Sequence, residues 1–179
     1  TDSTQSFLKS NGIDFKVISS KDFNHGTTRD YALSLSNHKY LIYITQDAIP
    51  YDKYTFEKLV NPLVENNQIA VTYGRQLPHK DADIFSRFAR INNYPNKSIL
   101  KDQAMIKELG IKTCSNSNSF AAYNKEIITK FGGFPHNVIM GEDVIVAAKA
   151  IKQGYKVYYN GDAKVYHSHN YTLSVEFRR

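Results

Sequence analysis

The chain has 179 residues, of which 41% are hydrophobic and 22% are charged; this is the composition of an ordinary globular protein and excludes a disordered chain. At this length we expect one domain that buries roughly 70% of its unfolded surface, and the single cysteine excludes an internal disulfide. The net charge of +6 is spread along the chain, so charge alone favours neither nucleic acid, an anionic membrane nor a phosphorylated small molecule.

Helices and strands alternate along the first half of the chain. Apolar spacing and residue type predict three of each: helices at 4–10, 27–36 and 53–65, and strands at 13–19, 39–45 and 68–74. Gly26 marks a turn before the second helix, with Thr27 or Thr28 as its N-cap. The 39–45 run is apolar and aromatic, which is typical of a strand buried on both faces. The alternation implies parallel strands in an α/β sheet.

The second half continues with the same two kinds of element. We predict helices and strands in this order: a helix at 82–94, a strand at 119–124, helices at 125–131 and 142–153, and strands at 155–160 and 163–169. In the first of these helices, Ile84, Phe85, Phe88 and Ile91 share one face. No stretch of the sequence reaches the roughly 20 apolar residues needed to cross a bilayer.

One acid stands where a buried strand is predicted to end. The segment "YLIYITQDAIP" runs apolar and then places Asp47 next to a turn. Ligands of open α/β sheets bind beyond the carboxyl ends of the strands, where loops converge. Asp47 is therefore a candidate ligand-binding residue, and the alternative is that it caps the turn at Ile49-Pro50.

Two further acids begin the helix predicted at 142–153. Glu142 and Asp143 follow Gly141, and acids in the first turn of a helix stabilise it by about 0.3–1 kcal/mol through the helix dipole. Adjacent carboxylates also repel each other, which raises the pKa of one of them into the range of a general base. The sequence leaves both interpretations open.

Histidines and arginines provide the remaining candidates. His167 and His169 share a face if the last strand continues, and either can bind a metal or simply form surface hydrogen bonds. Arg29 lies in the first turn of a helix and Arg75 follows the strand at 68–74. Either guanidinium matches the oxygens of a phosphate, and either can equally be a solvated surface arginine.

Five segments, in order, carry a resemblance to a known family: "FNHGTTRDYAL", "YITQDAIP", "YGRQLPHKDADIFSRFARINNYP", "FGGFPHNVIMGEDVIVAAKAIKQGYKVYY" and "AKVYHSHNYTL". Together they resemble bacterial family 2 glycosyltransferases, most closely the rhamnosyltransferase-like branch. The resemblance implies a GT-A fold, which is a three-layer, Rossmann-like α/β fold of nucleotide-diphospho-sugar transferases. It also implies a nucleoside-diphosphate sugar as donor and Mg²⁺ or Mn²⁺ as cofactor.

The same resemblance implies roles for the acids and one histidine. Asp47, the one acid of "TQDA", corresponds to the family's metal-binding motif, in which many relatives carry a second acid. "GED" is similar to the catalytic segment, with Asp143 as the base that deprotonates the acceptor hydroxyl and Glu142 orienting the acceptor. This implies a single displacement with inversion. His167, preferred over His169, corresponds to a late metal ligand.

Donor-binding residues are also implied by the resemblance, which places the nucleotide and its diphosphate against six side chains or backbone positions: Asn24, His25, Gly26, Arg29, Gln46 and Arg75. The favoured donor is dTDP-L-rhamnose, with a UDP-linked sugar as the alternative. The acceptor is an oligosaccharide or a lipid-linked sugar. The protein is expected in the cytoplasm, where it makes peripheral contact with the inner face of the membrane through its basic surface.

The resemblance further predicts that the chain begins after the first two strands of the family's fold. Relatives begin with two strands before a segment like "TDST", which here stands at 1–4, so those strands are expected to be missing, and the C-terminal "YTLSVEFRR" also resembles a cut end. A sheet without them exposes an apolar edge, which predicts weak nucleotide binding and association between copies. Two other functions remain open: a non-catalytic sugar-nucleotide-binding fragment and a basic nucleic-acid-binding domain.

Overall fold

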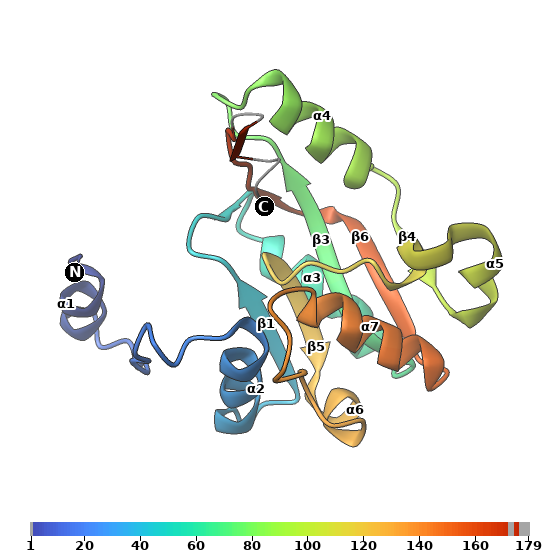
Figure 1. The fold of residues 1–179 in the computed structure, drawn as a ribbon, viewed down its shortest axis with the longest axis horizontal. Coiled ribbons are helices and arrows are strands. Elements are labelled where there is room, and N and C mark those ends of the chain that lie inside the picture. The colour runs from blue at the N-terminus through green and yellow to red at the C-terminus, as the bar shows by residue number, and fades with distance from the viewer. Residues whose placement is uncertain (1, 172–173, 176–179) are drawn as a thin grey trace.

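A six-stranded sheet forms the centre of the computed structural model, which describes residues 2–171 and 174–175 (Figure 1). Its strand order is β1-β5-β3-β6-β2, and β4 also pairs with β6. The strands have these bounds: β1 Tyr40–Ile44, β2 Ile49–Pro50, β3 Ile69–Leu77, β4 Ile99–Lys101, β5 Phe120–Asn124 and β6 Lys156–Tyr166.

The sheet is mixed rather than parallel, which corrects the prediction from the alternating pattern. β5 lies between β1 and β3 and is antiparallel to both, whereas β3 and β6 are parallel neighbours. β1, β3 and β6 therefore run in one direction, and their carboxyl ends reach the same end of the sheet. β2 and β4 pair with β6 in the antiparallel sense. The prediction missed this because sequence order does not reveal that a later strand inserts between two earlier ones.

Helices cover both faces of the sheet, so the architecture has three layers. Their bounds, with two short 3₁₀ turns, are α1 Thr4–Ser10, α2 His25–Leu35, α3 Thr55–Glu65, α4 Ile84–Asn93, η1 Gln103–Met105, α5 Ile106–Leu109, η2 Gly110–Cys114, α6 Lys125–Lys130 and α7 Glu142–Lys152. One core packs α2, α6 and α7 against the sheet, and a second core packs α3 against the other face. α7 and α3 lie on opposite sides of the sheet in Figure 1.

The strands that are buried on both faces are β3 and β5, not β1. In β5, Phe120 and Ala122 belong to the α3 core, while Ala121 and Tyr123 belong to the α7 core. β1 lies at an edge of the sheet, and its Ile42 and Ile44 side chains are 38% and 39% exposed. An apolar run of five residues does not distinguish an edge strand from a central one.

Three local predictions were wrong. Residues 13–19 form no strand, because no neighbouring strand of the described chain pairs with them and Val17 is exposed. Asn24, rather than Thr27 or Thr28, is the N-cap of α2, since its Oδ1 accepts hydrogen bonds from the N–H groups of Gly26 and Thr27. The two strands predicted at the end are one strand, β6, with an irregularity in its pairing to β3.

Helix α4 has the predicted amphipathic pattern, but its apolar face is not buried. Ile84, Phe85, Phe88 and Ile91 are between 59% and 75% exposed. In Figure 1, α4 lies beyond the carboxyl end of β3. No helix in the described part of the chain is long and apolar enough to span a membrane.

Candidate active-site cleft

A cleft of about 940 Å³ opens at the carboxyl ends of β1, β3 and β6. Its walls include the segment after β1, the last residues of β3, the start of α7, one side of α4 and the segment after β6. Asp47 and Asp143, almost a hundred residues apart in the chain, both line it. The cleft lies where ligands of open α/β sheets bind, since strands that run in one direction bring their following loops together.

Asp47 and two histidines form one side of the cleft. The Oδ2 atom of Asp47 lies 3.4 Å from Nε2 of His167 and 3.5 Å from Nε2 of His169. One ligand atom from each residue lies within 4.8 Å of the other two. One carboxylate oxygen and two imidazole nitrogens form a donor set that suits a divalent transition metal. His169, which the sequence ranked behind His167, belongs to this cluster as well.

A hydrogen bond to Gln76, on the side of the ring away from Asp47, fixes the orientation of His167. Nδ1 of His167 lies 2.8 Å from Oε1 of Gln76, and Nε2 of Gln76 donates to Oγ of Ser117. This amide orientation makes Oε1 an acceptor, so Nδ1 carries the proton and the lone pair of His167 lies on Nε2, toward Asp47. Burial lowers the pKa of His167 to about 4, although the charge of Asp47 acts in the opposite direction and that of Arg90 adds to the decrease. The imidazole is therefore neutral at physiological pH and able to bind a metal.

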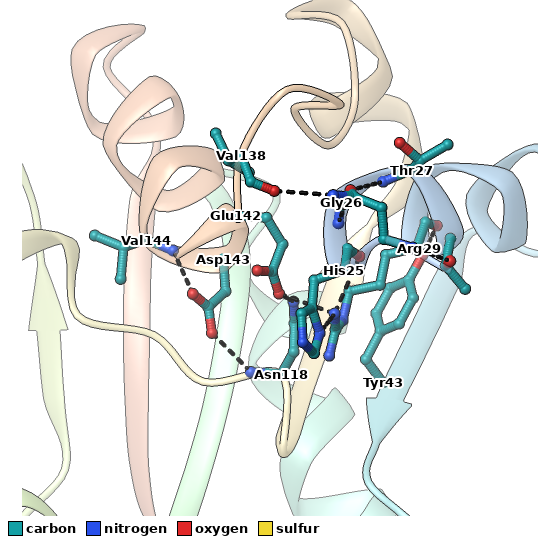
Figure 2. A network of polar contacts seen from close by, with 12 residues as sticks. His25, Gly26, Thr27, Arg29, Tyr43, Asn118, Val138, Glu142, Asp143 and Val144 are labelled. Carbon is teal, nitrogen blue, oxygen red and sulfur yellow. Dashed lines mark hydrogen bonds and ion pairs between the residues drawn. The ribbon is translucent and has the colours of Figure 1, made fainter. Parts of the chain in front are cut away.

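Asp143 is held in place on the other side of the cleft. Its Oδ2 accepts a hydrogen bond from the N–H of Asn118 at 3.1 Å, and its Oδ1 accepts one from the N–H of Val144 at 2.8 Å (Figure 2). Burial raises the pKa of Asp143 above its ordinary value because the charged form loses hydration. The negative charge of Glu142 adds to this shift, while the two N–H donors and Arg29 oppose it. A carboxylate with these properties can accept a proton from a hydroxyl.

Glu142, in the first turn of α7, forms a buried ion pair. Its Oε1 lies 3.0 Å from a guanidinium nitrogen of Arg29 and accepts a hydrogen bond from Nδ2 of Asn118. The same nitrogen of Arg29 contacts the ring and the carbonyl of His25, as Figure 2 shows. Arg29, His25 and Glu142 all line the cleft. This network connects the start of α2 to the start of α7.

Three of the predicted donor-binding residues are not among those that line the cleft: Asn24, Gly26 and Arg75. Asn24 caps α2 and donates to the carbonyl of Val138. A Cβ atom on Gly26 would lie 1.7 Å from the carbonyl oxygen of Pro135, so this glycine allows α2 to pack closely on the 133–141 loop. Arg75 donates from Nε to the carbonyl of Tyr94. Gln46 and His25, by contrast, do line the cleft.

The sequence reading missed the residues that support the candidate acids and histidines. Asn118 contacts both Glu142 and Asp143, and Ser117 contacts Gln76. Both come from the "SNSNS" run at 115–119, directly before the buried strand β5. A dense run of small polar residues at the end of a fully buried strand is the signal that could have identified this loop, since such side chains readily hydrogen-bond to nearby backbone and polar groups.

Comparison with known proteins identifies the family to which these residues belong. The sequence model described as "Glycosyl transferase family 2" matches residues 1–132, which is most of the chain. The chain belongs to glycosyl transferase family 2. The match includes Asp47 and ends before Asp143, His167 and His169.

Two relatives of this member of family 2 come from Salmonella. The O-antigen chain rhamnosyltransferase WbaN of Salmonella anatum is 42% identical over 180 residues, which cover 100% of this chain and 57% of the relative. The O-antigen chain rhamnosyltransferase RfbN of Salmonella typhimurium is 48% identical over 167 residues, covering 90% and 52%. The chain thus spans about half the length of these relatives.

Solved structures show the same fold at low sequence identity. The mannosyltransferase PcManGT from Pyrobaculum calidifontis, in complex with GDP-Man and Mn²⁺, superposes with a TM-score of 0.67 at 17% identity, over 94% of this chain and 45% of that one. TarS 1–349 from S. aureus gives a TM-score of 0.66 at 15% identity, over 92% and 47%. The predicted GT-A-like α/β fold is therefore confirmed, and the chain covers about half of each of these structures.

Proposed function

We propose that this protein is an inverting glycosyltransferase that moves a sugar from a nucleoside-diphosphate donor to a hydroxyl group of an acceptor. One observation carries the proposal: Asp143, a half-buried carboxylate with a raised pKa, lines the same cleft as the Asp47–His167–His169 cluster. A transferase of this kind needs a base beside the acceptor and positive charge beside the leaving group. The two sides of the cleft supply residues for these two tasks.

Asp143 acts as the base in this proposal. The acceptor hydroxyl attacks the anomeric carbon while its proton passes to the carboxylate of Asp143. The new glycosidic bond forms on the face opposite the bond to the departing nucleoside diphosphate, so the configuration of the anomeric carbon inverts. The two backbone N–H donors hold the carboxylate in position, and Glu142, fixed by Arg29, orients the acceptor.

Asp47, His167 and His169 would hold the cation. The residues fit this role because their ligand atoms converge and the Gln76 contact leaves Nε2 of His167 available. Two nitrogen donors favour Mn²⁺ over Mg²⁺, which prefers an all-oxygen environment. When bound, such a cation neutralises the charge that grows on the departing diphosphate. Gln46 and His25 line the same cleft, and in this proposal they contact the donor.

The donor sugar is L-rhamnose, carried as dTDP-rhamnose. Support comes from the names of the two Salmonella relatives, both of which are O-antigen chain rhamnosyltransferases. The same names support an oligosaccharide acceptor of the O-antigen type, which is extended one sugar at a time. A lipid-linked form of that acceptor would be presented at the surface of a membrane.

The protein works in the cytoplasm, at the inner face of the membrane. The exposed apolar face of α4 supports this location, because Phe85 belongs both to that face and to the cleft, and because α4 contains two arginines and no acid. Phe88→Glu should reduce sedimentation with phosphatidylglycerol vesicles, whereas Ile111→Glu, at a still more exposed residue elsewhere, should not. Equal sedimentation of Phe88→Glu and the unaltered protein would exclude α4 as the contact.

A transfer assay tests the catalytic proposal. With dTDP-rhamnose, Mn²⁺ and an O-antigen oligosaccharide, the protein should release dTDP, and Asp143→Asn should lower the rate by about 10²–10⁴-fold. The Kd for dTDP should stay unchanged, because the proposal places Asp143 beside the acceptor hydroxyl rather than the nucleotide. Transfer by Asp143→Asn at the original rate would exclude this residue as the base.

The same assay separates the alternative functions. A non-catalytic sugar-nucleotide-binding protein would bind dTDP with Mn²⁺ but release no product from any acceptor. A nucleic-acid-binding domain would bind neither, and family membership gives it no support. Analysis of the anomeric configuration of the product by NMR tests inversion directly.

A further inference from the structure

Two arginines are among the described residues that line the cleft, and only one of them forms an ion pair with an acid. Arg29 is paired with Glu142 at 3.0 Å. Arg90 forms no ion pair with an acid in the described part of the chain, and its guanidinium carbon lies 5.6 Å from the centre of the Tyr94 ring. Arg90 therefore presents a positive charge to the cleft that no described carboxylate neutralises.

Tyr94 supplies a fixed platform for this guanidinium. The carbonyl of Tyr94 accepts a hydrogen bond from Nε of Arg75 at 3.1 Å, and burial raises the pKa of the Tyr94 hydroxyl. A guanidinium against an aromatic ring loses little freedom when it binds a planar array of oxygens, because the ring already restricts its rotation. Arg75, which the sequence assigned to the donor, thus supports the residue on which Arg90 lies.

Arg90 also lines the same cleft as the metal-binding candidates. Ser86, Ala89 and Arg90 of α4 line the cleft together with His167 and His169, and the charge of Arg90 acts on His167. An uncompensated cation beside a cluster that binds a second cation is electrostatically unfavourable. An anion with several negative charges between Arg90 and the bound cation would attract both of them and offset their repulsion.

We propose that Arg90 binds the diphosphate of the sugar-nucleotide donor. This inference rests on the proposed function and adds a residue to it. A diphosphate offers oxygens that match the two-pronged guanidinium. After transfer, the same contact stabilises the extra negative charge of the released nucleoside diphosphate.

The neighbouring Arg87 provides a matched control on the same helix. Its Nε donates to the carbonyl of Ala82 and a terminal nitrogen donates to the carbonyl of Lys80, and Arg87 does not line the cleft. Replacing either arginine by glutamine removes one positive charge from α4. Only the loss of Arg90 should therefore affect a ligand in the cleft.

Isothermal titration of dTDP in the presence of Mn²⁺ tests the proposal. Arg90→Gln should raise the Kd for dTDP by about tenfold or more, as expected for the loss of a charge-assisted hydrogen bond. Arg90→Lys should recover part of the affinity, since it restores the charge but not the two-pronged geometry. Arg87→Gln should leave the Kd unchanged. Thymidine, which has no phosphate, should show no difference among the variants.

The outcomes distinguish this proposal from the proposed function. If Arg90→Gln binds dTDP as tightly as the unaltered protein while Asp47→Asn loses the Mn²⁺-dependent binding, Arg90 is not a diphosphate ligand and the proposed function stands. If Arg87→Gln weakens binding as much as Arg90→Gln, the effect is one of overall charge and the proposal is wrong. If the unaltered protein binds neither dTDP nor UDP with Mn²⁺, the proposed function itself fails. Thermal melts of each variant confirm that it is folded.

Discussion

The two sides of the cleft are held by the protein to very different degrees. On the Asp143 side, both carboxylate oxygens accept backbone hydrogen bonds, and Glu142 is only 6% exposed and paired with Arg29. On the other side, Asp47 is 37% exposed, and His167 and His169 approach it at 3.4 and 3.5 Å, longer than good hydrogen bonds. The carboxylate of Asp143, the proposed base, is thus held in one orientation, whereas the ligand atoms of the Asp47 cluster converge with few contacts between them.

This difference matches the two tasks. A general base must sit within hydrogen-bond reach of one hydroxyl group, so rigid positioning is useful. A metal site that takes part in a reaction must let the nucleotide product leave. Such a site keeps coordination positions on the metal that the protein does not fill. The 115–119 loop supports both sides, because Asn118 contacts Asp143 and Glu142 while Ser117 contacts Gln76 behind His167. Asp47 and Asp143 themselves have different contacts, so each can be replaced and tested separately.

The largest expected effect is on the Asp47 side. Asp47→Asn should weaken Mn²⁺ binding more than about a hundredfold, since removing a ligand costs more than the roughly 10–100-fold lost with a supporting residue. The Mn²⁺-dependent part of dTDP binding should disappear with it. Electron paramagnetic resonance of free Mn²⁺ and titration calorimetry measure the two quantities.

Asp143→Asn is the control for that change, because it removes one carboxylate from the same cleft. It should leave the Mn²⁺ and dTDP affinities within a factor of about two while transfer is lost. Equal losses of Mn²⁺ affinity in the two variants would mean that the cleft responds to total negative charge and that its two sides have no separate roles.

Much of the fold could be predicted from the sequence because helix caps, glycine stops and apolar spacing are local signals. The 142–153 helix and the 119–124 strand were predicted within a residue or two of α7 and β5. Burial could not be predicted in the same way. The α4 pattern gave a helix, but its apolar face is exposed, and the strand predicted at 13–19 has no partner. Both outcomes depend on which surfaces meet in space.

The candidate site shows the same limit in its side chains. Asp47, Asp143 and His167 were found from their positions at the ends of predicted elements and from the family resemblance, and the structure brings them to one cleft. Pairings could not be predicted, since Arg29 meets Glu142 across more than a hundred residues of chain. Arg90 was not predicted as a site residue, because the sequence of its helix was interpreted only through its apolar residues.

A smaller effect is expected from the residue behind His167. Gln76 is almost fully buried, and Gln76→Leu keeps its approximate size but removes the acceptor for the Nδ1 proton of His167. The imidazole can then rotate or change its tautomer, so Mn²⁺ affinity should fall by about 10–100-fold. Mn²⁺ titration by electron paramagnetic resonance measures the loss.

Two further variants distinguish orientation from general damage. Gln76→Glu retains an acceptor oxygen for Nδ1 and should recover most of the Mn²⁺ affinity. Tyr43→Phe removes a partly buried hydroxyl that donates to the carbonyl of Arg29, away from the Asp47 cluster, and should leave Mn²⁺ binding unchanged. If Gln76→Leu binds Mn²⁺ normally, the tautomer of His167 is not set by this contact.

The smallest expected effect is a pH shift on the Asp143 side. The positive charge of Arg29 lowers the pKa of Asp143, against the increase caused by burial, so Arg29→Gln should raise that pKa further. The base works only when deprotonated, and the acid limb of kcat/KM should therefore move to higher pH, with the rate above the limb less affected. Arg87→Gln, which removes an equal charge outside the cleft, should leave the limb in place. A limb that moves to lower pH in Arg29→Gln would show that another group, not Asp143, controls the acid side of the profile.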